Sequence, residues 1–89
     1  MTTFQELKPG DCFRLLIDGI PTTDIFLVVS FDIFHLDRVI RVRDERGGGR
    51  AIYINGSHAG QFEGYFRAES LVERFYVQGN KTDWHPATG

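Results

Sequence analysis

The residues best suited to bind a charged partner are five arginines and a tyrosine within one short stretch, residues 38–55. They are Arg38, Arg41, Arg43, Arg46, Arg50 and Tyr53. Guanidinium groups bind phosphates and carboxylates through paired hydrogen bonds, and a tyrosine ring can stack on a nucleic-acid base. All of these residues except Arg38 are therefore candidate binding residues.

This stretch is basic within an acidic chain. It carries five arginines against Asp44 and Glu45, a local charge of +3, whereas the rest of the chain carries five cations and ten anions, or −5. The contrast favours a partner steered by charge over general adhesion to DNA, because an acidic body repels a long polyanion. An equally good explanation is that the arginines only keep an exposed strand pair soluble and protect it from aggregation.

Residue types that catalyse reactions or bind metals do not form a recognised pattern. The histidines His35, His58 and His85 are far apart in sequence, and Cys12 has no second cysteine or histidine at zinc-ligand spacing. The glycine-rich residues 47–50 lack the Lys-Ser/Thr pair of a phosphate-binding P-loop. We therefore expect no enzyme activity, no metal and no cofactor.

The basic stretch is predicted to form a β-hairpin. Two runs that alternate apolar and polar residues flank three consecutive glycines, which is the period-two signature of half-buried strands. The residues predicted to face the core are Ile40, Val42, Ile52 and Ile54. Arg41, Arg43, Tyr53 and Asn55 would then share the open face, and the glycines would form a flexible tip.

The first part of the chain predicts a helical turn, a tight turn and a strand. Thr3 and Glu6 have the spacing of a capping box, and Pro9-Gly10 favours a type II turn because glycine tolerates a positive φ. Residues 11–18 then alternate in the pattern of a strand. The predicted inward residues of this strand are Phe13, Leu15 and Ile17.

Residues 24–34 form the most apolar run in the chain. The first half is apolar on both parities and the second half alternates, which predicts one long, bent strand that passes between sheet layers. The predicted inward residues are Ile25, Leu27, Val29, Phe31 and Ile33. The expected core combines Leu27, Val29 and Phe31 with the inward residues of the other strands and with Leu71.

The last third of the chain predicts a loop, two short strands and a tail. Residues 65–68 and 74–77 have strand composition, and a helix over residues 68–77 is the competing interpretation. The strand at 74–77 is the predicted sheet edge at which a homodimer would form. We expect residues 1–77 to form one small β domain and residues 78–89 a polar, mobile tail.

Together these elements predict a mainly β fold. We expect a small SH3-like barrel, or a rolled antiparallel sheet, of about five strands with one or two short helical turns; an OB-like barrel is the alternative. The string Phe4-x-x-Leu7-x-x-Gly10-Asp11-x-Phe13, with Ala68-Glu69-Ser70-Leu71 before the last strand, resembles small SH3-like barrel proteins of phages and mobile elements. In those proteins Gly-Asp starts the first strand and a short late turn precedes the closing one. The resemblance supplies no catalytic residues.

Two classes of function are compatible with the sequence. The first is a non-enzymatic protein-binding module, an accessory of a phage or mobile element that acts on a host or phage protein. The second is a nucleic-acid-binding barrel whose arginines in residues 38–55 hold phosphates. The sequence has no apolar run of the roughly 18 residues needed to span a membrane and no signal-peptide pattern, so we expect a cytoplasmic protein.

Overall fold

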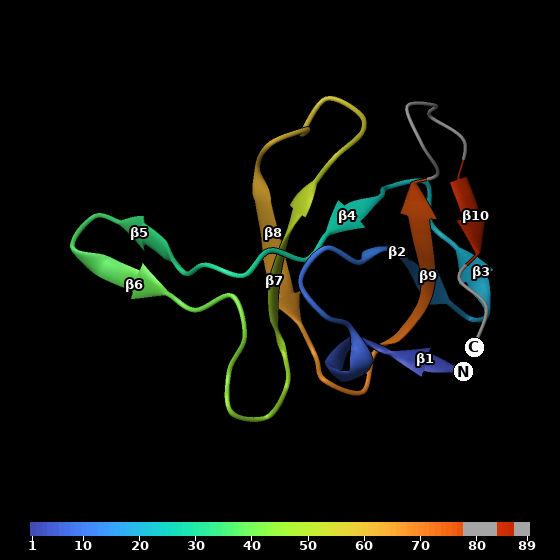
Figure 1. The fold of residues 1–89 in the computed structure, drawn as a ribbon, viewed down its shortest axis with the longest axis horizontal. Coiled ribbons are helices and arrows are strands. Elements are labelled where there is room, and N and C mark those ends of the chain that lie inside the picture. The colour runs from blue at the N-terminus through green and yellow to red at the C-terminus, as the bar shows by residue number, and fades with distance from the viewer. Residues whose placement is uncertain (78–83, 87–89) are drawn as a thin grey trace.

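The fold is a curved antiparallel sheet with a small separate hairpin (Figure 1). The structure is a computed structural model that describes residues 1–77 and 84–86. Its strands are β1 (Thr2–Thr3), β2 (Cys12–Ile17), β3 (Ile20–Pro21), β4 (Phe26–Leu27), β5 (Ile33–His35), β6 (Arg38–Ile40), β7 (Gly49–Tyr53), β8 (Phe62–Phe66), β9 (Leu71–Val77) and β10 (Trp84–Pro86). The 3₁₀ helix η1 (Phe4–Glu6) is the one helix among the described residues. The predicted mainly β, antiparallel fold is confirmed.

The main sheet does not close into a barrel among the described residues. Its strands follow the order β1-β9-β2-β4-β7-β8, with β10 also paired to β9 and β3 also paired to β2. Strand β2 connects the two halves, because it pairs with β9 on one side and with β4 on the other. Strands β5 and β6 pair only with each other, as a second sheet.

The predicted helical turn and tight turn near the N-terminus are confirmed. The Thr3 hydroxyl donates to a carboxylate oxygen of Glu6 at 3.2 Å beside η1. Gly10 has a φ of 96°, as a type II turn requires. The backbone N–H of Asp11 donates to the carbonyl of Lys8 at 3.0 Å, and this closed turn positions the start of β2.

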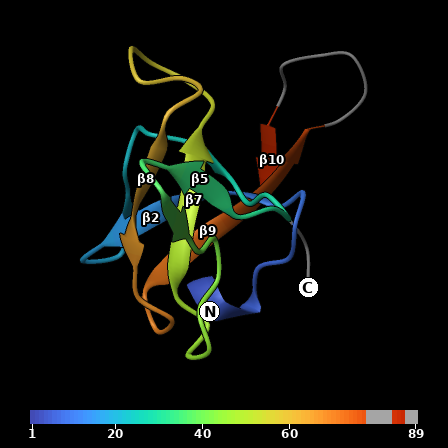
Figure 2. The ribbon, with the colours of Figure 1, turned by 90° about the vertical axis from the view of Figure 1, so that its left-hand side faces the viewer.

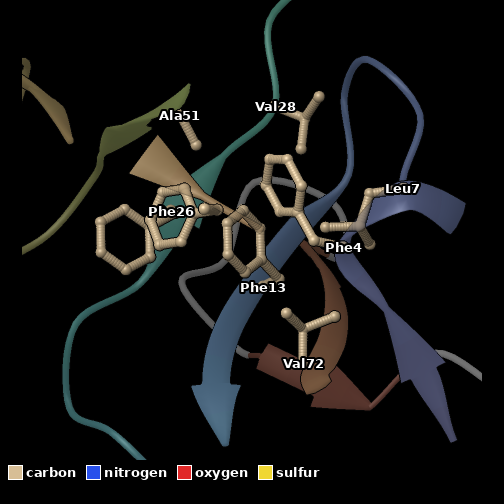
Figure 3. Close-up of a cluster of buried hydrophobic side chains, with 8 residues drawn as sticks. Phe4, Leu7, Phe13, Phe26, Val28, Ala51 and Val72 are labelled. Carbon is tan, nitrogen blue, oxygen red and sulfur yellow. The ribbon is translucent and has the colours of Figure 1, made fainter. Parts of the chain in front are cut away.

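A cluster of aromatic rings fills the core (Figure 3). The ring centre of Phe13, which is fully buried, lies 5.5 Å from that of Phe4, 5.3 Å from that of Phe26 and 5.4 Å from that of Phe66. The remaining buried members of this cluster are Leu7, Val28, Ala51 and Val72. Aromatic pairs at these separations contribute beyond the area they bury, so the four phenylalanines organise the domain.

The predicted core is correct only in part. Phe13 and Val42 are buried as expected. The predicted core residues that are only half-buried are Leu15, Leu27, Val29, Ile40, Ile52 and Ile54. Those that are exposed are Ile17, Phe31 and Leu71.

The predicted long strand over residues 24–34 is wrong. Only β4 joins the main sheet, and the chain leaves the sheet after Val28, whose N–H donates to the carbonyl of Asp11 at 2.9 Å. Phe26 and Val28 are buried, so the inward parity is opposite to the predicted one, and Phe31 is 58% exposed. Because the first half of the run is apolar on both parities, its pattern cannot fix which side faces the core.

The predicted hairpin over residues 38–55 is also wrong. Strand β6 pairs with β5, whereas β7 pairs with β4 and β8. Among the described residues, the predicted pairing survives as a single bridge between Arg43 and Gly49. Within β7, Ala51 is fully buried and Ile52 only half-buried, so the inward parity is again reversed.

The consecutive glycines lie in a packed turn between two closely approaching backbone segments, which corrects the predicted flexible tip. Gly48 and Gly49 are buried, and a methyl group added to Gly49 would overlap the carbonyl oxygen of Val42. The Asp44 carboxylate closes this loop by accepting the N–H groups of Arg46 at 2.9 Å and Gly48 at 3.0 Å. The backbones approach so closely here that only glycine fits.

The C-terminal strands decide between the two interpretations of residues 68–77. Residues 71–77 are strand β9, and no helix forms there. Strand β9 pairs with β2 on one side and with β1 and β10 on the other, so it is not the free edge predicted for a homodimer. Residues 84–86 of the predicted tail form β10, while the mobility predicted for residues 78–83 and 87–89 lies outside the described residues.

Candidate functional site

The five candidate binding residues do not form one surface. Arg50 and Tyr53 are half-buried in β7, Arg43 is bridged to Gly49, and Arg41 and Arg46 lie in the connection between β6 and β7. The separation follows from the corrected strand pairing, because β6 and β7 belong to different sheets.

Arg43 attaches the N-terminal segment to the connection between β6 and β7. Its guanidinium donates to the carbonyl oxygens of Gln5 at 3.1 Å and of Leu7 at 2.9 Å. The same group lies 4.9 Å from the centre of the Phe4 ring, a cation–π contact. The predicted open-face orientation of Arg43 is therefore wrong, and its contacts indicate a structural role.

Tyr53 packs against the core, which corrects its predicted place on an open face. Its ring centre lies 4.6 Å from that of Phe26 and 5.3 Å from that of His58. Its hydroxyl donates to Glu63, which raises the pKa of Tyr53 to about 12 and lowers the pKa of Glu63 from its ordinary value. Asn55, predicted beside it, instead bonds two backbone groups of the loop before β4, each at 2.9 Å.

Arg41 and Arg46 are exposed, but they lie in a patch of mixed charge. They line a hollow together with Asp44, Glu45 and Tyr65. The Tyr65 hydroxyl donates to Asp44, and this bond holds the pKa of the Asp44 carboxyl below its ordinary value. A phosphate backbone would therefore meet carboxylates as well as guanidinium groups here, which weakens the nucleic-acid interpretation.

Hairpin β5–β6 carries exposed apolar side chains away from the main sheet. Figure 1 shows the hairpin projecting from the body, and Figure 2 views the molecule from that side. We call three residues the hairpin surface: Phe34, Leu36 and Val39, which are exposed by 76%, 80% and 55%. Phe34 and Val39 are direct partners in the strand pair, so their side chains lie on the same face.

The turn at the tip of this hairpin holds a leucine in an unfavourable backbone conformation. Leu36 has a φ of 49° and Asp37 a φ of 59°, as in a two-residue type I′ turn. Aspartate tolerates this region, but a leucine is disfavoured there by about 1 kcal/mol or more. Backbone strain and the largest apolar exposure of the hairpin surface thus coincide at Leu36.

The base of the hairpin is closed by a hydrogen bond between the two segments that flank it. A carboxylate oxygen of Asp32 accepts the N–H of Val42 at 3.0 Å, which joins the two ends of the hairpin. Ile33 and Ile40, which face each other across the strand pair, are half-buried. An isolated two-stranded hairpin is marginal in water, so this base and any covering surface decide how well it is ordered.

The candidate catalytic residues show no assembled site in the described part of the chain. Burial, and then the nearby Asp11 carboxylate, raise the pKa of the Cys12 thiol, which makes it a poor nucleophile. No group of three or more His, Cys, Asp or Glu residues is arranged to hold a metal ion in residues 1–77 and 84–86. No helix in the same residues is long and apolar enough to cross a membrane.

Sequence reasoning missed the hairpin surface, because the tip lacks the Asn-Gly or Asp-Gly pair that usually marks a type I′ turn. The available signal was the run of Ile33, Phe34, Val39 and Ile40 around a two-residue turn.

Comparisons with protein-family models, curated proteins and solved structures found no match to this chain.

Proposed function

We propose that this protein is a non-enzymatic binding module that attaches to another protein through hairpin β5–β6. One observation carries the proposal: a hairpin outside the main sheet presents Phe34, Leu36 and Val39 to solvent. Exposed apolar residues gathered on one projecting element mark interaction surfaces.

The size of the hairpin surface sets the strength of the expected complex. Complete burial of one fully exposed side chain of this kind contributes about 1.5–3 kcal/mol, so three of them contribute at most roughly 4.5–9 kcal/mol before the cost of association. That amount supports a specific complex only if polar contacts add to it. Arg38 and Arg41, both exposed beside the hairpin surface, would supply these contacts to a partner with an acidic rim.

The biological setting is part of the same proposal. Small size and the resemblance to SH3-like barrels of phages and mobile elements support an accessory protein that acts on a host protein in the cytoplasm. The entry into β2 through Gly10-Asp11 and the turn at residues 67–70 before β9 support an SH3-like relationship, with the sheet left open.

Nucleic-acid binding is the weaker alternative. Arg43 and Tyr53 are engaged in contacts within the domain, and Arg50 is half-buried in β7. The two exposed candidates, Arg41 and Arg46, lie in a patch of mixed charge. We expect negligible retention on heparin or single-stranded DNA at physiological salt. Retention there that is lost in the double variant Arg41→Ala/Arg46→Ala would favour the nucleic-acid function instead.

The proposal is tested by affinity capture with matched variants. Immobilised parent protein and the variants Phe34→Ser, Leu36→Ser and Ile20→Ser are incubated with lysate of the cells that produce the protein, and the retained proteins are quantified. Ile20 is the control, because it is 68% exposed but lies on β3 in the main sheet. We expect a retained protein to fall about tenfold or more in both hairpin variants and to persist with Ile20→Ser.

Equal retention by the parent and both hairpin variants would reject the hairpin as the binding surface. Sedimentation of the purified parent distinguishes a foreign partner from a second copy of this chain. A dimer that Phe34→Ser dissociates would assign the hairpin surface to self-association.

A further inference from the structure

Strand β8 is the end of the main sheet. One of its edges pairs with β7, and the other edge has no strand partner in the described chain. An unpaired edge offers a row of backbone N–H and C=O groups to which an extended chain can add as a further strand. This edge is distinct from the hairpin surface, so a ligand bound along it would be additional to the partner of the hairpin.

A groove runs beside this edge. Residues 63–67, from β8 and the position after it, form one wall, and Ile17 and Thr22 of the β2–β3 region belong to the other. Phe26 and Phe66, both buried members of the core, contribute to its lining. The groove has a volume of about 560 Å³, within the range of sites that hold small molecules or short peptide segments.

The groove contains a polar group without a partner. The Thr22 hydroxyl oxygen is buried and has no hydrogen-bond partner among the described residues. Tyr65 and Ile17, by contrast, are 51% and 60% exposed where they line the groove. The Thr22 hydroxyl is covered, so an incoming chain would contact the exposed side chains of Tyr65 and Ile17.

The charge of the groove is acidic. Its lining residues include two acidic side chains, Asp24 and Glu63, and one basic side chain, Arg67. Glu63 is fixed by the Tyr53 hydroxyl and by the N–H of Gly64 at 3.0 Å, so its carboxylate is held in place for a cationic group. The groove therefore selects against anionic ligands.

We propose that this groove binds an extended segment of another protein, added as a strand to the free edge of β8, in which apolar residues alternate with lysine or arginine. Alternate side chains of an added strand point to opposite sides, so the cations of one set would enter the groove and reach Asp24 and Glu63, while the apolar set would lie on the other face of the extended sheet. A second copy of this chain does not fit, because pairing two β8 edges would bring the carboxylates of both grooves together.

The competing explanation is that the irregular pairing between β7 and β8 only protects the sheet edge. The register shifts between Gly49 and Ala51, opposite Gly64, and such bulges are a common way to discourage edge-to-edge association. If the bulge only protects the edge, the groove binds no peptide. Titration with a peptide therefore distinguishes the two explanations.

The probe is a blocked peptide of about ten residues in which valine alternates with lysine, compared with the same peptide carrying glutamate in place of lysine. Backbone amide NMR spectra of the parent are recorded during titration. We expect saturable shifts centred on residues 62–66, and binding of the lysine peptide about tenfold or more tighter than that of the glutamate peptide.

Two further readouts identify an added strand. Two peptides are prepared, one N-methylated at its odd-numbered amides and the other at its even-numbered amides. One of them should not bind and the other should bind nearly as well as the unmodified peptide, because only one edge of the peptide faces β8. Ile17→Ser and Asp24→Lys should each weaken binding by about tenfold, whereas Val39→Ser on the hairpin surface should have no effect.

Three results would overturn the inference. They are no saturable binding up to about 1 mM peptide, equal affinity for the lysine and glutamate peptides, and shifts confined to the hairpin. Variant spectra that keep the dispersion of the parent show that the fold is intact. Since Phe34→Ser tests the hairpin and Ile17→Ser tests the groove, failure of one proposal leaves the other standing.

Discussion

Replacement of Arg43 by alanine separates a structural arginine from a binding arginine. In the structure this side chain bonds the carbonyls of Gln5 and Leu7 and covers the Phe4 ring. Arg41, two residues earlier, is exposed and serves as the matched control. The two residues are equivalent by sequence pattern, so their variants test the corrected fold directly.

The expected magnitude follows from these contacts. The part-buried bond to Leu7 involves a charged donor and contributes about 1.5–3 kcal/mol, and the exposed bond to Gln5 about 0.5–1 kcal/mol. The cation–π contact with Phe4 adds about 0.5–1 kcal/mol. Since contacts made by one group are not fully additive, we expect Arg43→Ala to lower the free energy of unfolding by about 2–4 kcal/mol.

The assay is urea denaturation followed by far-ultraviolet circular dichroism. Arg41→Ala should change the free energy of unfolding by less than about 0.5 kcal/mol. Arg43→Lys should recover only part of the loss, because an ammonium group cannot span two carbonyls as a guanidinium does. Equal small effects of Arg43→Ala and Arg41→Ala would refute the structural role of Arg43.

Three other predictions concern the aromatic core, the buried residue Gly49 and the hydrogen-bonded pair of Tyr53 and Glu63. Phe13→Ala should lower the free energy of unfolding by about 3–5 kcal/mol, whereas Phe31→Ala, at a 58% exposed position, should lower it by less than about 1 kcal/mol; equal losses in urea melts would contradict the described core. Gly49→Ala should reduce the thermal midpoint strongly because its methyl group overlaps a backbone carbonyl, and an unchanged midpoint would disprove that contact. Glu63 has a folded pKa below its ordinary value, so its contribution to stability is present above the unfolded pKa and is lost as pH falls through the folded one. Tyr53, with a pKa raised from 10.0 to about 12, contributes stability that is full below the unfolded pKa and is lost as pH rises toward 12. Tyr53→Phe should remove the alkaline dependence of the urea midpoint and reduce the acid one, because the Gly64 N–H still binds the Glu63 carboxylate.

The sequence correctly predicted structural features that depend on interactions between neighbouring residues. Pro9-Gly10 indicated a turn, which has a positive φ at Gly10, and the alternation around Phe13 indicated a strand with Phe13 inward. The short helical turn after Thr3 followed from its spacing to Glu6. In each case the interactions that determine the structure join residues a few positions apart, so the local sequence is sufficient to predict them.

Long-range pairing could not be predicted in the same way. Residues 38–43 and 50–55 both alternate, and alternation identifies strands without naming their partners. The partner of β6 is β5, joined by a Leu36-Asp37 turn that lacks glycine and asparagine. Arg43 and Tyr53 were misplaced for this reason, since their true neighbours come from η1 and β8.

The glycines illustrate the same limit. Three in a row suit a flexible tip, but buried Gly49 is needed because the chain at Val42 passes against it. Such an approach between strands is a property of the assembled fold. The free edge of β8 and the exposure of Phe34 likewise depend on strand order, which no local pattern contains.

Site-specific photo-crosslinking tests the proposed protein-binding role of the hairpin most directly. A benzophenone-bearing phenylalanine analogue is placed at Phe34 in one protein and at Ile20 in another, and both are irradiated inside the cells that produce the chain. We expect a discrete covalent adduct with another protein from position 34 and none from position 20, because only the first lies on the hairpin surface. Adducts at background level from position 34, or the same adducts from both positions, would contradict the account.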